Sequence, residues 1–206
     1  MKTHRTLVLL SGGVDSTATL WHILHRPDEY GEILVHHIHL HNVEKRWKAE
    51  AQAVKAILAY MREHASTPFI ASESVIAVPN VGRHFLYDVE AMGFITGYIT
   101  FRDPLVTKIA IGVTGDDWER SSISGTVAKS KSLHNAFHTN VKDHSGTVKV
   151  FPLRDMTKQQ VYESMPPELA RLTWSCRTPR EMNGAFIECG RCKACRGELQ
   201  RLKRHN

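Results

Sequence analysis

Short apolar runs that alternate with amphipathic segments are the feature that most limits how this chain of 206 residues can fold. The runs are rich in β-branched residues and mostly apolar on both sides, which is typical of strands covered on both faces of a sheet. In the longest segment between them, Ala53, Ile57 and Met61 recur at helical spacing. We expect strands at 6–10, 32–40, 74–78, 108–113 and 147–153, and helices at 16–25, 44–64, 85–100, 127–140 and 158–164. The alternation predicts a doubly wound α/β fold with a mostly parallel sheet.

The size of the chain and its hydrophobic content of 42% favour one main core with a small appendage. After Pro166 and Pro167 the pattern gives way to a polar tail, so we expect a main domain at 1–165 and a small segment at 166–206. No run reaches the roughly 18 apolar residues of a membrane span, and the first apolar run is too short for a signal peptide, so we expect a cytoplasmic protein. The net charge of +6 suits anionic substrates such as nucleotides or nucleic acid.

The four cysteines of the chain all lie in its last fifth, which predicts a metal site. Three of them are spaced as C-x2-C-x2-C, with the fourth thirteen residues upstream of the first. Four thiolates match a closed, tetrahedral structural zinc site with no open position for catalysis. An iron–sulfur cluster is the rival metal interpretation, and free buried cysteines would need no metal. The expected ligands are Cys176, Cys189, Cys192 and Cys195.

The sequence SGGVDS at 11–16 follows the first expected strand and precedes the first expected helix. In an open parallel sheet, this first turn is a common phosphate site. Gly12 and Gly13 let the backbone approach a ligand closely, and the helix directs its first N–H groups at an anion. Asp15 beside a phosphate implies a bridging Mg²⁺. The pattern is neither a Walker A loop nor a G-x-G-x-x-G dinucleotide loop. An ordinary turn in which Asp15 caps the helix would also fit these residues.

This loop resembles the SGGxDS pyrophosphate loop of the PP-loop ATP pyrophosphatases, which have the adenine nucleotide α-hydrolase-like fold. Those enzymes adenylate a carbonyl or amide oxygen and release pyrophosphate. Together with the cysteines, further motifs along nearly the whole chain resemble the 7-cyano-7-deazaguanine synthase family. These motifs are RWKAE at 46–50, VPNVGRHFL at 78–86, IGVTGDDW at 111–118, FPLRDMTKQQV at 151–161, LTWSC at 172–176 and CGRCKACR at 189–196.

The resemblance implies an ATP-dependent carbon–nitrogen ligase that converts 7-carboxy-7-deazaguanine and ammonia into the nitrile through an amide. It implies ATP and Mg²⁺ alongside the Zn²⁺ expected at the cysteines, and Lys158 reaching the phosphates. The implied catalytic residues are Ser11, Asp15, Ser16 and Lys158; the implied ATP contacts are Leu9, Leu10, Ser11, Gly12, Gly13, Val14, Asp15, Ser16 and Thr17; and the implied substrate contacts are Arg46, Arg83 and Asp117.

Two positions depart from the family pattern and leave the substrate and product open. The segment 119–130 differs from the family's S-G-Y-P-D-C-R, and His84 stands where the family prefers Asn. A branch that stops at the amide, or one that serves viral DNA modification, is compatible with these departures. The sequence also leaves open an enzyme that adenylates a tRNA base and a non-catalytic, zinc-stabilised nucleic-acid-binding protein.

Two further expectations concern partners and a run of histidines. The family resemblance implies a homodimer. The expected strand at 32–40 carries several histidines, which we interpret as hydrogen-bonding or titrating groups rather than as metal ligands. These are His36, His37 and His39, followed by His41.

Overall fold

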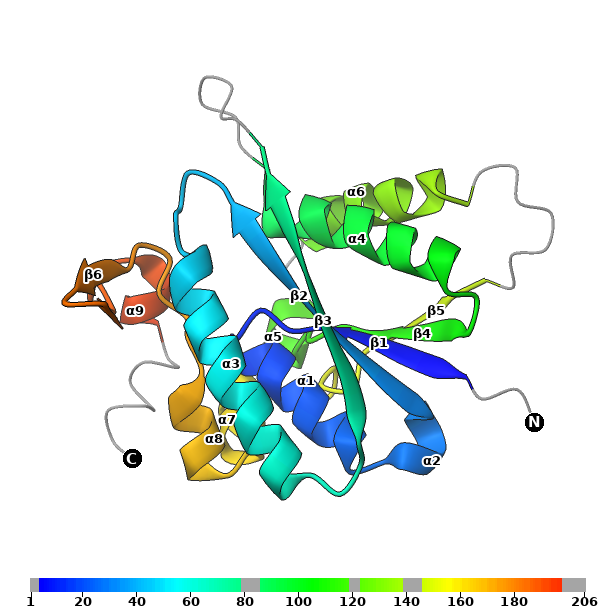
Figure 1. The fold of residues 1–206 in the computed structure, drawn as a ribbon, viewed down its shortest axis with the longest axis horizontal. Coiled ribbons are helices and arrows are strands. Elements are labelled where there is room, and N and C mark those ends of the chain that lie inside the picture. The colour runs from blue at the N-terminus through cyan, green and yellow to red at the C-terminus, as the bar shows by residue number, and fades with distance from the viewer. Residues whose placement is uncertain (1–3, 79–85, 119–122, 139–145, 198–206) are drawn as a thin grey trace.

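The computed structural model describes residues 4–78, 86–118, 123–138 and 146–197 (Figure 1). Its main sheet has five parallel strands in the order β3-β2-β1-β4-β5. The chain adds strands outward from β1 in both directions, first β2 and β3 on one side and then β4 and β5 on the other. This is the doubly wound α/β fold that the sequence predicts. The strands are β1 (Arg5–Leu9), β2 (Glu32–His41), β3 (Phe69–Ala77), β4 (Val106–Ala110) and β5 (Val148–Val150).

Helices cover both faces of this sheet (Figure 1). One face carries the larger core, in which Val8 of β1 and Ile33 of β2 pack against the helices of that side. Leu7 and Ile109 point the other way and build a smaller core. This alternation follows from the two-residue repeat of a strand. The first face is covered by α1 (Val14–Leu24), α3 (Trp47–His64), α7 (Lys158–Glu163) and α8 (Pro167–Leu172), and the second by α4 (Asp88–Arg102) and α6 (Ile123–Ala136).

The register of the strands brings three chain segments to one edge of the sheet. Val8 of β1 pairs with Val35 on one side and with Ala110 on the other. Because all three strands are parallel, the loop after β1 lies beside the end of β4 and the middle of β2. Two short helices, α2 (Pro27–Tyr30) and α5 (Gly115–Trp118), complete the connections. Phosphate-binding turns of α/β proteins occur at this carboxyl edge.

The polar tail begins inside the main core. Leu169 and Ala170 of α8 are buried in the larger core, and Thr173 ends this helix. The chain then forms a hairpin of β6 (Arg180–Met182) and β7 (Ala185–Ile187), followed by α9 (Lys193–Arg196). The hairpin turns at Asn183 and Gly184, which both have positive φ, as a two-residue turn between antiparallel strands requires. The division of the chain at residue 165 stays a prediction.

Several element bounds differ from the expected ones. β3 begins at Phe69, five residues before the expected start, because it is the edge strand and its polar residues face solvent. α3 begins at Trp47 and α4 at Asp88, each three residues later than expected. Arg46, directly before α3, and Asp88, the first residue of α4, both line the cavity of the candidate site. Among the described residues, no helix is long and apolar enough to cross a membrane.

Candidate ATP and metal sites

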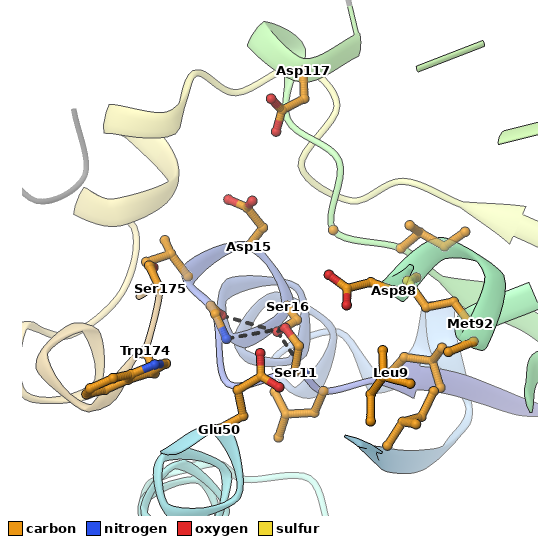
Figure 2. A pocket seen from close by; sticks show the side chains of 18 of the residues that line it. Leu9, Ser11, Asp15, Ser16, Glu50, Asp88, Met92, Asp117, Trp174 and Ser175 are labelled. Atoms are coloured by element: carbon orange, nitrogen blue, oxygen red, sulfur yellow. Dashed lines mark hydrogen bonds between the residues drawn. The ribbon is translucent and has the colours of Figure 1, made fainter. Parts of the chain in front are cut away.

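The loop that follows β1 is held in shape by its own serines. The backbone N–H of Ser11 donates to Oγ of Ser16 over 3.2 Å, and the two hydroxyl oxygens lie 3.1 Å apart (Figure 2). Gly12 has a φ of +81°, and a Cβ there would lie 3.3 Å from the carbonyl oxygen of Glu50. The loop therefore needs glycine at position 12.

The N–H groups in the first turn of α1 are available to bind a ligand. Gly13 is the N-cap residue and gives no side-chain hydrogen bond, so Asp15 does not cap this helix. The first N–H groups of a helix and its dipole then favour an anion at this point. Of the expected ATP contacts, Leu10, Val14 and Thr17 are buried and fix the loop to the core, while Ser11 is exposed.

Lys158 joins two carboxylates beside the loop. Its Nζ lies 2.7 Å from Asp117 and 3.3 Å from Asp15, and its backbone N–H donates to Asp116 over 2.7 Å. Burial works against the charge of Lys158, but the neighbouring Asp15 and Asp117 outweigh it and raise the pKa, so the ammonium stays charged. Burial raises the pKa of Asp15, although Lys158 counteracts this.

The loop and Lys158 open into one large cavity of about 660 Å³. Figure 2 shows Asp15 and Asp117 on one side of this cavity, Leu9 and Met92 on another, and Glu50 and Trp174 beside the loop. Apolar side chains of β1, β2 and α4 supply a wall of the kind that accepts a planar ring, and the charged groups lie around it. A cavity of this volume is within the usual range of small-molecule binding sites.

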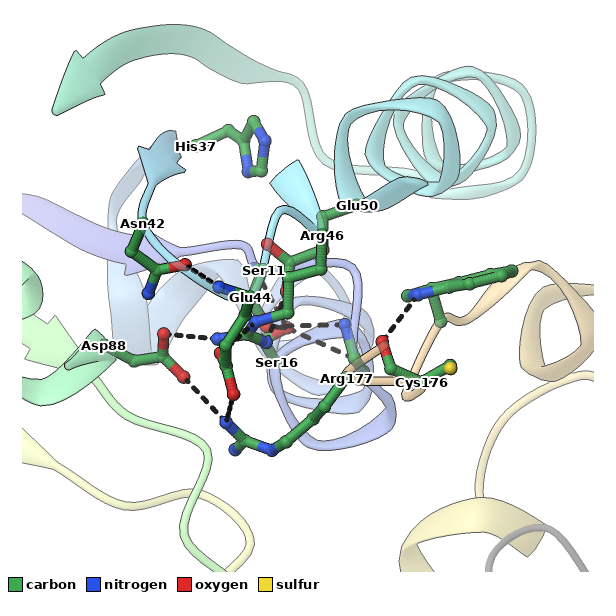
Figure 3. Close-up of polar contacts among 12 residues, drawn as sticks. Ser11, Ser16, His37, Asn42, Glu44, Arg46, Glu50, Asp88, Cys176 and Arg177 are labelled. Carbon is green, nitrogen blue, oxygen red and sulfur yellow. Dashed lines mark hydrogen bonds and ion pairs between the residues drawn. The ribbon is translucent and has the colours of Figure 1, made fainter. Parts of the chain in front are cut away.

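Arg46 forms ion pairs with three carboxylates at the start of α3. It donates to Glu44 over 2.8 Å, to Glu50 over 2.5 Å and, with its remaining terminal nitrogen, to Asp88 (Figure 3). Arg177 joins the same group from the far end of the chain, 3.3 Å from Glu44 and 3.8 Å from Asp88. We call these five residues the arginine–carboxylate cluster. Every nitrogen group of Arg46 is therefore already bound to a carboxylate of the protein.

Glu50 is the most buried carboxylate of this cluster, with 8% of its side chain exposed. Burial raises its pKa to about 7, although Arg46 pulls in the other direction. Figure 2 shows its carboxyl group directed towards Ser11. The carboxyl group of Glu50, beside the loop, can therefore gain or lose a proton near neutral pH.

The four cysteines converge as expected. Their sulfur atoms all lie within 4.8 Å of one another, and Cys176 and Cys195 are buried. Backbone N–H groups donate to three of the sulfurs: Cys189 to Cys176 over 3.2 Å, Cys192 to Cys189 over 3.3 Å, and Cys195 to Cys192 over 3.4 Å. The hydroxyl of Thr178, the largest influence, and nearby backbone N–H groups lower the pKa of Cys189 to about 5. Burial raises the pKa of Cys176 and of Cys195. Four sulfurs this close together fit a tetrahedral metal ion, which binds cysteines as thiolates.

The remaining predicted residues fall in different places. Arg83 and His84 lie outside the described residues, as do residues 119–122 of the segment that departs from the family pattern. His36 is buried, with its two ring nitrogens bonded to Ser72 and Ser74, and burial lowers its pKa to about 4. His37 donates to the carbonyl oxygen of Leu10 over 2.8 Å. Among described residues, the cysteines are the only metal-ligating side chains that converge in a group of three or more.

Sequence reasoning missed Glu50, Asp88, Trp174 and Arg177 as residues of the cavity. Glu50 stands inside the RWKAE motif and Trp174 inside LTWSC, so both motifs carried a signal. Glu50 pairs with Arg46 only four residues away. Asp88, Trp174 and Arg177 reach the cavity from segments far apart in sequence, and spacing within one segment does not reveal such contacts.

Two comparisons with known proteins found a match, one to a family and one to a solved structure. The family model described as "Queuosine biosynthesis protein QueC" matches residues 5–205. Among solved structures, the fold is similar to that of the U34-tRNA thiolase NcsA from Methanococcus maripaludis with its [4Fe-4S] cluster, with a TM-score of 0.57 and 12% identity. The match covers 98% of this chain but spans only 65% of that one. No match is found among the curated proteins. The chain belongs to the QueC family of queuosine biosynthesis proteins, which points to ATP-dependent chemistry of the 7-deazaguanine type.

Proposed function

We propose that this protein uses ATP to convert 7-carboxy-7-deazaguanine and ammonia into 7-cyano-7-deazaguanine through the amide. The observation that carries the proposal is one cavity that joins a phosphate-type loop, a charged lysine between two aspartates, and the arginine–carboxylate cluster. The QueC family match supports the substrate class. The loop, the lysine and the cluster each have a separate task around the cavity.

The loop is suited to hold the pyrophosphate part of ATP. The available N–H groups of α1 and the hydroxyls of Ser11 and Ser16 are hydrogen-bond donors for phosphate oxygens. Lys158 adds a positive charge between Asp15 of this loop and Asp117. Oδ1 of Asp15 is buried and has no hydrogen-bond partner, which fits a carboxylate oxygen that binds a cation. Mg²⁺ bound there would neutralise phosphate charge.

Each round of the reaction then needs orientation and charge neutralisation rather than a protein nucleophile. In the first round, a carboxylate oxygen of the substrate attacks the α-phosphorus of ATP, and pyrophosphate leaves. Ammonia attacks the resulting acyl adenylate, AMP leaves, and a proton is released. In the second round, the amide oxygen attacks the α-phosphorus of a second ATP, and pyrophosphate leaves. Loss of AMP and of the two N–H protons then gives the nitrile. Lys158 and the loop stabilise the charge that develops on the leaving pyrophosphate.

The arginine–carboxylate cluster is suited to the other end of the cavity. Arg46 is proposed to act on the substrate by ordering Glu50 and Asp88, because its own nitrogens are already bonded to carboxylates. Such carboxylates complement the N–H donors of a guanine-like edge. Asp117, in contrast, contacts Lys158, which supports a role on the phosphate side rather than at the substrate edge.

The cysteine site is proposed to hold Zn²⁺ in a structural role. Four thiolates fill a tetrahedral shell, so the ion has no open position for substrate. An iron–sulfur cluster is the other group that four cysteines can hold, and the NcsA structure contains a [4Fe-4S] cluster. Metal analysis together with the visible absorption spectrum distinguishes the two, because zinc thiolates are colourless and iron–sulfur clusters are not.

The test of this function is mass spectrometry of the product formed from 7-carboxy-7-deazaguanine, ammonium, Mg²⁺ and ATP. A nitrile supports the full reaction, and an amide alone supports a branch that stops halfway. No pyrophosphate release with this acid contradicts the proposal. Pyrophosphate release that depends on tRNA would instead support an enzyme that adenylates a tRNA base, and salt-sensitive RNA or DNA binding without ATP turnover would support a non-catalytic binder. The homodimer stays a prediction, which sedimentation equilibrium tests.

A further inference from the structure

The segment between α8 and the first metal-ligating cysteine contacts the ATP loop directly. The backbone N–H of Trp174 donates to the carbonyl oxygen of Gly12 over 2.8 Å. The indole N–H of the same residue donates to the carbonyl oxygen of Cys176 over 3.0 Å. Figure 2 shows Trp174 and Ser175 beside the loop, and Figure 3 shows the bond to Cys176. One residue therefore links the loop to a ligand of the metal site.

The bond from Trp174 determines which way the peptide between Gly12 and Gly13 faces. In a planar trans peptide, the C=O and N–H groups point in opposite directions. Because the carbonyl of Gly12 points to Trp174, the N–H of Gly13 points into the loop, where it lies 3.4 Å from Oγ of Ser11. We add this N–H, at the N-cap of α1, to the donors proposed for phosphate. Two neighbouring glycines make the opposite orientation of this peptide accessible if the bond is lost.

The residue after Cys176 contacts the other end of the cavity. Arg177 pairs with Glu44 over 3.3 Å and with Asp88 over 3.8 Å, and both carboxylates also bind Arg46. At its other end the segment is fixed, since Thr173 is buried and its hydroxyl donates to the carbonyl oxygen of Ala170 in α8. The position of Cys176 thus affects contacts on both sides of the cavity.

We infer that Trp174 is a positioning residue that makes nucleotide binding depend on metal occupancy of the cysteine site. The metal holds Cys176, Cys176 holds the indole, and the backbone of Trp174 holds the Gly12–Gly13 peptide in the orientation that binds phosphate. The inference rests on the proposed ATP and metal sites. By linkage, a bound nucleotide increases the affinity for the metal by the same factor by which the metal increases the affinity for the nucleotide.

The first experiment measures both sides of this linkage in the full-length protein. Calorimetry gives the Kd of a Mg²⁺-bound, non-hydrolysable ATP analogue for protein loaded with Zn²⁺ and for protein stripped with a chelator. Competition with the chelator gives the Zn²⁺ affinity with and without the analogue. We expect both affinities to change by about tenfold, within the range usual for coupled sites. Equal nucleotide affinity with and without Zn²⁺ overturns the inference alone, whereas no binding by the loaded protein contradicts the proposed function.

A second experiment keeps the metal in place, so that folding of the cysteine segment is not at issue. Trp174→Phe removes the indole N–H and retains the ring. We expect about three- to tenfold weaker nucleotide binding at unchanged Zn²⁺ content, the effect of losing one hydrogen bond. Trp21→Phe is the matched control, since Trp21 packs against the core on α1. Equal nucleotide affinity in the two variants contradicts a positioning role for Trp174.

A third variant tests the peptide orientation itself. Gly13 has a φ of −76°, and a Cβ there would meet no atom closer than 3.4 Å. Reversing the Gly12–Gly13 peptide would carry this φ into the positive region, which alanine rarely adopts. Gly13→Ala therefore favours the binding orientation even without metal, and the ratio of nucleotide affinities between loaded and stripped protein should fall towards one. A ratio equal to that of the unmodified protein overturns the proposed route.

Discussion

Lys158 donates to the carboxylate of Asp117 over 2.7 Å, although the two residues lie 41 positions apart in the chain. The same ammonium group reaches Asp15 of α1, so three elements meet at one charge. Without the lysine, two carboxylates would face each other across a partly dehydrated cavity. The lysine therefore both neutralises these aspartates and keeps a positive charge where the phosphates are proposed to lie.

Replacing Lys158 by methionine should lower the rate of pyrophosphate release by about 10²- to 10³-fold, because a charge that stabilises the leaving group is lost. Steady-state kinetics with saturating acid and ATP provide the measurement. Lys129→Met is the control, since Lys129 pairs with Glu90 on the surface and is 59% exposed. Comparable rates for the two variants would show that Lys158 has no part in the reaction.

Gly12→Ala should destabilise the fold by about 1–2 kcal/mol, the cost of a side chain in the left-handed region. The new Cβ would also press on the carbonyl oxygen of Glu50 and on Val54, both 3.3 Å away. Gly12→Ala should also weaken nucleotide binding, because the loop changes shape. Urea unfolding compares this variant with Gly13→Ala, which has a negative φ and ordinary contacts. Equal stability of the two variants would contradict the assigned loop conformation.

Glu50 should make the protein less stable as the pH rises. Its folded pKa of about 7 lies above its ordinary value of 4.5, so the folded state holds the proton more tightly than the unfolded chain does. The penalty for ionisation is absent below pH 4.5, grows between 4.5 and 7, and is complete above 7.

Relative to Glu50→Gln, the unmodified protein should therefore lose about 3 kcal/mol of stability across that pH range, an order-of-magnitude figure. Urea unfolding at several pH values measures the difference. Glu63→Gln, at an exposed position on the same helix, serves as the control. If the curves for the unmodified protein and Glu50→Gln run parallel, the buried carboxyl does not titrate as described.

Cys192→Ser should release the metal, because it removes one of four thiolates and a sulfur that accepts from the N–H of Cys195. Hydrogen exchange should then increase at 176–196 while β1 and α1 stay protected. Thr178→Val should have a smaller effect, since it removes only the hydroxyl that donates to Cys189 over 3.1 Å. Full metal retention by Cys192→Ser would show that this cysteine is not a ligand.

The parts of the fold that could be predicted are those with a local cause. β1, the glycine loop and α1 follow one another within twenty residues, and each has its own signal in apolar runs, glycines and helical spacing. The cysteine cluster could be expected for the same reason. The hairpin of β6 and β7 is absent from the predicted elements, although Asn183-Gly184 is a strong signal for a two-residue turn.

The rest of the site depends on contacts between distant segments. Nothing near Arg177 in the sequence indicates that it pairs with Glu44, which precedes it by 133 residues. The family resemblance implies a substrate contact for Arg46. In the structure it binds three carboxylates instead: Glu44 before α3, Glu50 in α3 and Asp88 in α4. Glu44 and Glu50 lie within four residues of Arg46, but Asp88 and Arg177 come from distant segments, so a pattern along the chain could not predict the whole cluster.

The β6–β7 hairpin has a consequence for how the metal site is assembled. Cys176 and Cys189 are thirteen residues apart, and the hairpin between them supplies the chain reversal through its own hydrogen bonds. The hairpin therefore shares with the ion the entropy cost of closing that loop. Two strands of three residues each are too short to persist alone, so the hairpin and the metal site should form together, each stabilising the other.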